Sequence, residues 1–397
     1  MRFSIRPDHR RSGSKDPSAS SGLSVLILSG LSLTCLATAT ATAQAQNAAR
    51  QSLPAEQTAA AFADPNWELP RLSWGDPDLQ GDFTSRDMSG VPMQRAQQYG
   101  TQQSLTIEQF QERAGNTGRA NSIRGGEEFE GNARLQLSAF DSGETGTRSF
   151  GYTSYVIDPE DGSMPALTEE ARQRQGGRAG QANGPFYTMQ DFGYYDRCIT
   201  RGIIGSITPS LYGDAMRIVQ SPTEVAISYE MLHDTRVIPL DGRSQADPGV
   251  RQYMGSSVGH WEGNTLVIET TNLTEEVGLG RYSTSEDAVL TERITRIDPD
   301  MINYVVTVDD PRTYERPWTM RMTLTTQPNY EILEYSCHEG NFFVANALRA
   351  EKLYQERVAE ALANGQPMPQ RSEPGAGGSN IYTPPSSAEA FDINAGE

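Results

Sequence analysis

The chain has 397 residues, and its 51 acidic and 33 basic residues give a net charge of −18 at pH 7. A surface this acidic disfavours nucleic acid and anionic lipid as partners. Lysine occurs only at Lys15 and Lys352, which leaves almost no candidate residue for a Schiff-base or pyridoxal mechanism. We therefore predict no nucleic-acid partner and no cofactor, and the composition identifies no protein partner.

Residues 1–45 have the order of segments that is typical of a secretory signal peptide. A basic stretch is followed by an apolar run at 23–36 and by small residues ending in Ala43-Gln-Ala45, the pattern of a cleavage site. The run is shorter than the ~20 apolar residues of a membrane-spanning helix. We expect a periplasmic or secreted protein without a membrane span. The pair Arg10-Arg11 leaves the twin-arginine export route open beside the general one.

Cleavage of that segment would remove Cys35 and leave Cys198 and Cys337. Two cysteines in an oxidising compartment predict one disulfide bond, and two buried free thiols are the alternative. A bond that closes a loop of about 140 residues is worth roughly 2–5 kcal/mol on the chain-entropy model.

After the export signal, composition divides the chain into three parts. We expect a linker at 46–75, a single β-rich domain at 76–364 and a disordered Pro/Gly/Ser tail at 365–397. Within the domain, residues 85–150 contain few aliphatic side chains, so we expect an irregular excursion there. Helices are expected at 167–175 and 342–363.

The domain is predicted to be mainly β. Short runs of β-branched and alternating apolar residues are separated by turn residues, as at the tight turn Glu262-Gly-Asn264. A long series of antiparallel strands joined by short turns closes most simply into a barrel or a strongly curved sheet. We expect a first strand shortly after Asp76 and further strands at 152–157, 216–220, 225–231, 236–240, 257–261, 265–271, 289–297, 303–308, 318–325 and 332–337.

Seven motifs are spread over the same region. They are Asp76-Pro-Asp-Leu-Gln-Gly81, Asp158-Pro-Glu-Asp-Gly162, Arg197-Cys-Ile-Thr-Arg-Gly202, His233-Asp-Thr-Arg-Val-Ile-Pro-Leu-Asp-Gly242, Trp261-Glu-Gly-Asn-Thr-Leu-Val-Ile-Glu-Thr270, Val308-Asp-Asp-Pro311 and Tyr335-Ser-Cys-His-Glu-Gly-Asn341. In these motifs the chain resembles a large family of secreted bacterial proteins for which no activity is established. It departs from the family pattern at Phe83, where Trp is usual, and at Asn264, where Asp is usual. The Gly-x-aromatic start before a meander also resembles lipocalin-like barrels, a likeness of fold alone.

The histidines that follow the export signal all lie within these motifs, at His233, His260 and His338. Their spacing matches no zinc-binding motif, so we predict no metal site. If two strand ends meet, the predicted catalytic set of His233, Asp234 and Glu339 would place an imidazole beside carboxylates for acid–base chemistry. The alternative is that 225–239 is one strand and that His233 is a buried residue on its apolar face. Burial in an apolar lumen would lower the pKa of that histidine and make it a neutral base.

Candidate ligand-binding residues gather around the two cysteines. A Cys198–Cys337 bond would hold its Cα atoms about 4.4–6.8 Å apart and so bring Arg197 next to His338 and Glu339. Arginine binds a carboxylate bidentately, although Arg197, Arg201 and Arg236 could instead pair with the carboxylates of this acidic protein. The predicted ligand-binding set is Arg197, Arg201, Tyr335, His338 and Asn341.

These observations favour an exported β-barrel-like protein that binds a small, partly apolar organic ligand. One alternative is a cofactor-free lyase, isomerase or hydrolase that uses a His/carboxylate pair. A third possibility is a structural envelope protein without a pocket. A converging pair of His233 and Glu339 would favour the enzyme, whereas a fully packed interior would favour the structural role.

Overall fold

The computed structural model describes residues 58–88, 90–113, 150–177, 185–210, 213–275, 284–327 and 330–369. The predicted export signal, most of the predicted excursion and nearly all of the predicted tail lie outside these residues. Among the described helices, none combines the length and hydropathy that a membrane crossing requires.

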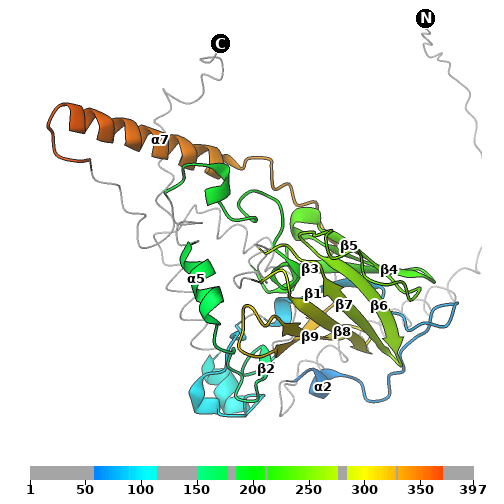
Figure 1. The fold of residues 1–397 in the computed structure, drawn as a ribbon. Helices are drawn as coiled ribbons and strands as arrows, with labels where there is room; N and C mark the ends of the chain where they lie inside the picture. The colour runs from blue at the N-terminus through cyan, green and yellow to red at the C-terminus, as the bar shows by residue number, and fades with distance from the viewer. Residues whose placement is uncertain are drawn as a thin grey trace, which may run out of the picture. The chain divides into compact units, whose positions relative to one another are not determined.

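The described chain is mainly β, as predicted (Figure 1). Its strands are β1 (Gly81–Thr84), β2 (Val156–Asp158), β3 (Ala215–Gln220), β4 (Glu224–Tyr229), β5 (Thr235–Pro239), β6 (Ser256–Glu262), β7 (Thr265–Thr271), β8 (Val289–Asp298), β9 (Met301–Asp309) and β10 (Trp318–Thr325). The α-helices are α2 (Ala59–Phe62), α5 (Glu169–Gly177), α6 (Ile203–Ile207) and α7 (Phe342–Ala363). Short 3₁₀ turns are η1 (Arg86–Met88), η2 (Gln97–Tyr99), η4 (Met189–Asp191) and η5 (Met231–His233).

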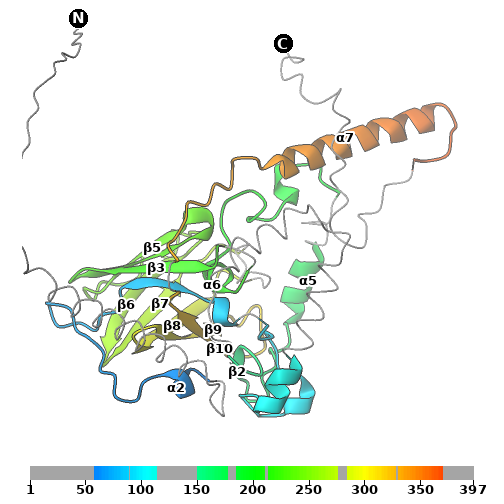
Figure 2. The same cartoon turned by 180° about the vertical axis from the view of Figure 1, so that it is seen from behind.

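The strands form one antiparallel sheet in the order β5-β4-β3-β1-β10-β9-β8-β7-β6, with β2 also paired to β10. Two meanders, β3 to β5 and β6 to β10, are therefore joined through the short strand β1. Figure 2 shows β1 running between β3 and the strands of the second meander. The prediction of an antiparallel, strongly curved sheet with a C-terminal helix is confirmed.

The two edge strands approach each other through side chains. A Cβ added to Gly259 of β6 would lie 2.8 Å from Ile238 Cγ2 of β5, and Arg236 Nη1 of β5 lies 3.4 Å from Ser257 Oγ of β6. In the described residues no backbone ladder joins β5 to β6. The curvature therefore brings the edges together, but hydrogen bonds do not close the sheet into a barrel.

Alternation along the strands sets the inner face. In β3, Met216 and Ile218 are buried while Arg217 and Val219 between them are exposed, as the two-residue period of a strand requires. Strands β4, β5 and β9 show the same alternation, whereas β7 and β10 contain runs of consecutive buried residues.

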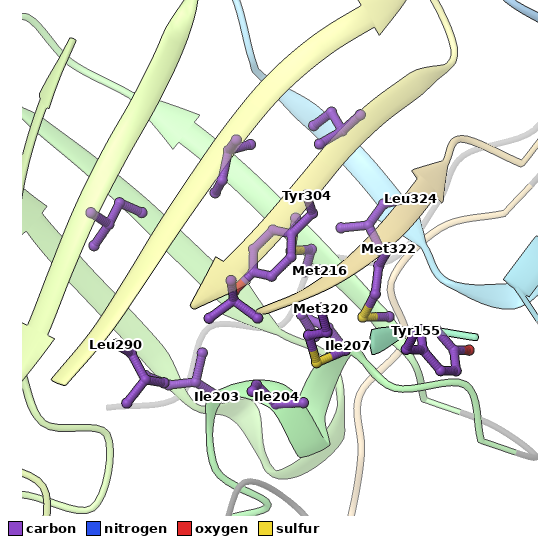
Figure 3. Packing of buried hydrophobic residues seen from close by; sticks show 14 of the residues in the cluster. Tyr155, Ile203, Ile204, Ile207, Met216, Leu290, Tyr304, Met320, Met322 and Leu324 are labelled. Atoms are coloured by element: carbon purple, nitrogen blue, oxygen red, sulfur yellow. The ribbon is translucent and has the colours of Figure 1, made fainter. Parts of the chain in front are cut away.

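The inner face is filled by side chains. Figure 3 shows Ile203, Ile204 and Ile207 of α6 beside Leu290 and Met320 from the strands. The whole of α6 is buried, and it was not predicted. The largest fully buried side chains include Trp318, Tyr304, Phe83, Phe150 and Phe192. A ligand in the middle of the sheet would therefore have to displace packed core residues.

Helix α7 has the predicted bounds, 342–363. Its first turns pack on the segment that contains η4, where Val344 and Ala347 bury Phe192. The Phe186 and Phe192 rings stack with centroids 4.4 Å apart, and Phe343 meets both edge-on. The helix thus fixes the loop that precedes Cys198.

Two sequence interpretations are wrong. Residues 332–337 form no strand but an extended segment that is held by side chains. The interpretation of 225–239 as one strand fails because β4 ends at Tyr229 and the chain turns at η5, where Leu232 and His233 have φ of 66° and 58°. Left-handed backbone at two residues that are not glycine is costly, and nothing in the residue types predicts it.

Candidate functional site

The predicted disulfide between Cys198 and Cys337 is confirmed, with the two Cα atoms 5.8 Å apart. It joins the loop before α6 to the segment that leads from β10 into α7. Residues far apart in the sequence therefore meet here, as expected from the cysteines alone.

The loop at 193–199 is held by its own hydrogen bonds. Arg197 N donates to Gly193 O over 3.2 Å, and Ile199 N donates to Tyr194 O over 2.8 Å. The Asp196 carboxylate accepts from Gly193 N at 3.2 Å, and burial raises the pKa of that carboxyl. Asn341, at the start of α7, donates to Asp196 O at 2.8 Å. The loop is thus fixed from both sides of the disulfide.

Tyrosine rings from three separate segments meet around this loop. The hydroxyls of Tyr195 and Tyr335 lie 2.9 Å apart. The rings of Tyr194 and Tyr253 have centroids 5.3 Å apart, and the His233 ring meets Tyr335 edge-on at 6.4 Å. Tyr195 and Tyr253 are exposed, so the arrangement forms part of the protein surface.

Two arginines lie over these rings. Arg197 Cζ is 4.8 Å from the centroid of Tyr194, and Arg201 Cζ is 5.5 Å from that of Tyr195. Arg201 Nη1 also lies 3.1 Å from Met231 Sδ. The two distances from Cζ to the ring centroid are typical of cation–π contacts.

We call the group of Tyr194, Tyr195, Arg197, Arg201, His233, Asp234, Tyr253 and Tyr335 the aromatic–arginine cluster. It contains five of the eight residues predicted to be catalytic or ligand-binding: Arg197, Arg201, His233, Asp234 and Tyr335. Tyr253 was not predicted, because the sequence around it carries no motif.

Asp234 is the half-buried carboxylate of the cluster. Its Oδ2 accepts a hydrogen bond from Thr200 Oγ1 at 2.6 Å, and Thr200 Oγ1 also lies 3.3 Å from Met254 Sδ. Burial raises the pKa of the Asp234 carboxyl, while the Thr200 hydrogen bond and the His233 charge act against that shift. Thr200 therefore ties the turn at η5 to the disulfide loop.

His233 is exposed. It is neither the buried core histidine nor the neutral base in an apolar lumen that the sequence suggested, because the turn at η5 directs it away from the core. Its roles in binding or catalysis stay predictions.

Three predicted residues lie outside the cluster: Asn341, which donates to Asp196 O, His338 and Glu339. Glu339 and His338 are exposed, and neither side chain forms a hydrogen bond or ion pair with the described residues. The expected pair of His233 and Glu339 is therefore not formed. His260 lies instead on the β6–β7 hairpin, 3.3 Å from Glu262, and within the described part of the chain no His, Cys, Asp and Glu side chains group as metal ligands.

Arg236 belongs to the core and not to the cluster. It forms a bidentate ion pair with Glu292, with nitrogen–oxygen distances of 2.6 and 2.7 Å. Tyr229 OH accepts from Arg236 Nη2 at 2.8 Å, and Tyr304 OH donates to Glu292 at 2.5 Å. Burial opposes the charge on Arg236, but Glu292 and the two tyrosines hold the pKa of Arg236 well above its ordinary value. Of the two roles considered for Arg236, binding a ligand or pairing with the protein's own carboxylates, the structure shows the second.

Left-handed backbone is concentrated at the cluster. Four described residues other than glycine have positive φ, and three of them are Cys198, Leu232 and His233. Such conformations cost of order 1–3 kcal/mol each and persist where the surrounding structure over-determines them, often at binding sites.

Comparison with models of known protein families and with curated protein sequences finds no match for this chain. The resemblance to a family of secreted bacterial proteins therefore stays a prediction, and the site has to be interpreted from its own geometry.

Proposed function

We propose that the protein is exported and that its aromatic–arginine cluster binds a small, partly apolar organic ligand. The observation that carries this proposal is the convergence of four tyrosine rings and two stacked arginines on one disulfide-fixed loop. Apolar surface combined with a few fixed polar groups is what small-molecule sites require.

Because the inner face of the sheet is packed, we place the ligand at the exposed aromatic–arginine cluster and not inside the sheet. A ligand held in a central lumen, as in lipocalin-like barrels, would compete with Trp318, Tyr304 and the Arg236–Glu292 pair, which are fully or almost fully buried. Tyr195 and Tyr253 are exposed, so a ligand reaches the cluster without displacing core residues. The disulfide supports export, because such bonds persist in oxidising compartments.

The proposal is tested by screening a library of small aromatic compounds against the purified protein by ligand-observed NMR. Hits should bind the wild-type chain and lose at least about tenfold in affinity, or ~1.4 kcal/mol, in a Tyr195→Ala/Tyr253→Ala variant, which removes one exposed ring from each tyrosine pair. The matched control is Tyr187→Ala, which removes an exposed tyrosine outside the cluster. Hits that bind the double variant as well as they bind the control would refute the cluster as the site.

A second candidate, a cofactor-free lyase, isomerase or hydrolase, has one observation in its favour. His233 lies exposed beside Asp234, whose carboxyl pKa is raised by burial, so two groups of different acid strength are neighbours. Glu339 makes no contact with either, so the proposed chemistry is confined to His233 and Asp234. Incubation of a metabolite mixture with wild-type protein and with His233→Ala distinguishes the candidates. Turnover that the variant abolishes supports the enzyme, and binding without turnover supports the ligand-binding protein.

A further inference from the structure

We propose that Arg197 is the anion-binding group of the aromatic–arginine cluster and that the ligand is an organic acid with a carboxylate beside a planar or aromatic group. This inference rests on the proposed ligand-binding function. It adds the charge and the chemical class of the ligand.

The guanidinium of Arg197 has no counter-ion among the described residues. It lies over the Tyr194 ring, and its Nε is buried without a hydrogen-bond partner. Elsewhere in the same chain, Arg217 binds the Asp82 carboxylate through Nε and Nη2 at 2.6 and 2.7 Å. A partly desolvated cation without an opposite charge is unfavourable. A carboxylate on the terminal nitrogens of Arg197 would supply that charge while Nε stays enclosed.

Two carboxylates of the same region are engaged with other groups. Asp196 accepts from the backbone of Gly193 at 3.2 Å, and Asp234 accepts from the Thr200 hydroxyl at 2.6 Å. Neither forms an ion pair with Arg197. Among the described residues, acids pair with Arg217 and Arg236 but none pairs with Arg197.

The surroundings of Arg197 favour a planar group next to the carboxylate. The Tyr194 ring lies under the guanidinium, and the Tyr253 ring follows at 5.3 Å with a tilt of 55°. A carboxylate on the terminal nitrogens would carry its attached group along these rings, where aromatic surface packs well. The disulfide at Cys198 fixes the adjoining backbone, which lowers the entropy lost on binding.

A carboxylate fits better than a phosphate, which arginine also binds. A phosphate monoester carries nearly two negative charges at neutral pH. The chain has a net charge of −18, so it repels a doubly charged ligand more strongly than a singly charged one. One guanidinium is matched by the single charge of a carboxylate.

The test compares matched anionic and neutral ligands on the disulfide-intact protein. Benzoate is measured against benzamide, and 2-naphthoate against 2-naphthamide, by ligand-observed NMR, with phenyl phosphate as a third probe. We expect each carboxylate to bind at least about tenfold more tightly than its amide, because a charge-assisted bond is lost in the amide. In Arg197→Gln the two should bind within about twofold of each other, since glutamine carries no charge. Arg197→Lys, which keeps the charge, should retain part of the preference and serves if the glutamine variant fails to fold.

The control is Arg357→Gln, which removes the same charge from an exposed position on α7 and should leave the preference unchanged. The inference is overturned if wild-type protein binds amide and carboxylate equally, if the preference survives in Arg197→Gln, or if phenyl phosphate binds more tightly than benzoate. Binding of aromatic compounds without a charge preference would remove this inference and leave the proposed function standing. Failure of every aromatic compound to bind would remove the proposed function itself.

Discussion

Replacing Glu292 by glutamine tests whether the buried ion pair holds the curved sheet together. The side chains of Arg236 and Glu292 are 3% and 0% exposed. The carboxylate accepts two hydrogen bonds from Arg236, one from Tyr304 and a longer one from Thr270. Glutamine keeps one acceptor and adds an amide donor, so Arg236 loses its counter-charge and meets at least one donor.

The expected loss follows from these contacts. A buried donor left without an acceptor costs about 1–3 kcal/mol, and removing one partner of a buried ion pair costs about 3–5 kcal/mol in all. Domains are stable by only about 5–15 kcal/mol, so Glu292→Gln should remove a large part of the stability. The measurement is urea unfolding followed by circular dichroism, with the disulfide intact.

Two comparisons make this experiment decisive. Asp82→Asn breaks the bidentate pair with Arg217, whose side chain is 48% exposed, and should cost less than about 1 kcal/mol. A variant with Arg236→Met, Glu292→Leu, Tyr229→Phe and Tyr304→Phe replaces the buried polar group by apolar side chains and should recover most of the loss. If Glu292→Gln costs no more than Asp82→Asn, the ion pair does not stabilise the sheet.

Three further predictions concern other parts of the fold. Cys198→Ser/Cys337→Ser opens a loop with a sequence separation of 139 residues and should lower the free energy of unfolding by roughly 2–5 kcal/mol, and alkylation of the wild-type protein without reductant should add no mass to either cysteine. Gly259→Ala should cost about 1–3 kcal/mol in urea unfolding because its Cβ would lie 2.8 Å from a β5 side chain; an unchanged free energy of unfolding would show that β5 and β6 do not touch at this position. Burial raises the pKa of Asp214 above 3.8, so the folded state binds the extra proton, and this contribution to stability is present at low pH and lost as pH rises through the raised pKa. Wild-type stability should therefore fall relative to Asp214→Asn as the pH rises through the raised pKa of Asp214, and parallel pH profiles would contradict the shift.

Local sequence predicts the strands because runs of β-branched and apolar residues, and the turn residues that separate them, are local properties. The predicted segments 265–271 and 318–325 match β7 and β10, and 342–363 matches α7. The end of that helix is signalled by Asn364-Gly365, where Gly365 takes a φ of 62°, as a helix C-terminus commonly requires.

The failures have non-local causes. Residues 332–337 read as a strand, but the Glu230 carboxylate binds Tyr330 OH at 2.5 Å and Leu333 N at 3.1 Å, so this segment is fixed by a side chain and not by a neighbouring strand. The α6 helix forms because it fills the inner face, which no short window of sequence reveals.

In the candidate site, too, some features follow from the sequence and others depend on tertiary structure. The cysteines predicted which loops meet, and Arg197 and Tyr335 followed from that pairing. The exposure of His233 and the absence of a His233–Glu339 pair depend on the turn at η5 and on the path of the last segment, and both are set by tertiary structure.

The position of β1 also determines the order in which the sheet can form. Each meander consists of neighbours in sequence, so its hairpins can form from local contacts soon after their residues are available. Strand β1 has only four residues, yet it pairs with Ile218 through Gly81 and with Thr325 through Thr84. Strand β1 can therefore complete its pairing only once β10 is present, and we expect the joining of the two meanders through β1 to be the slow, entropically costly step of folding.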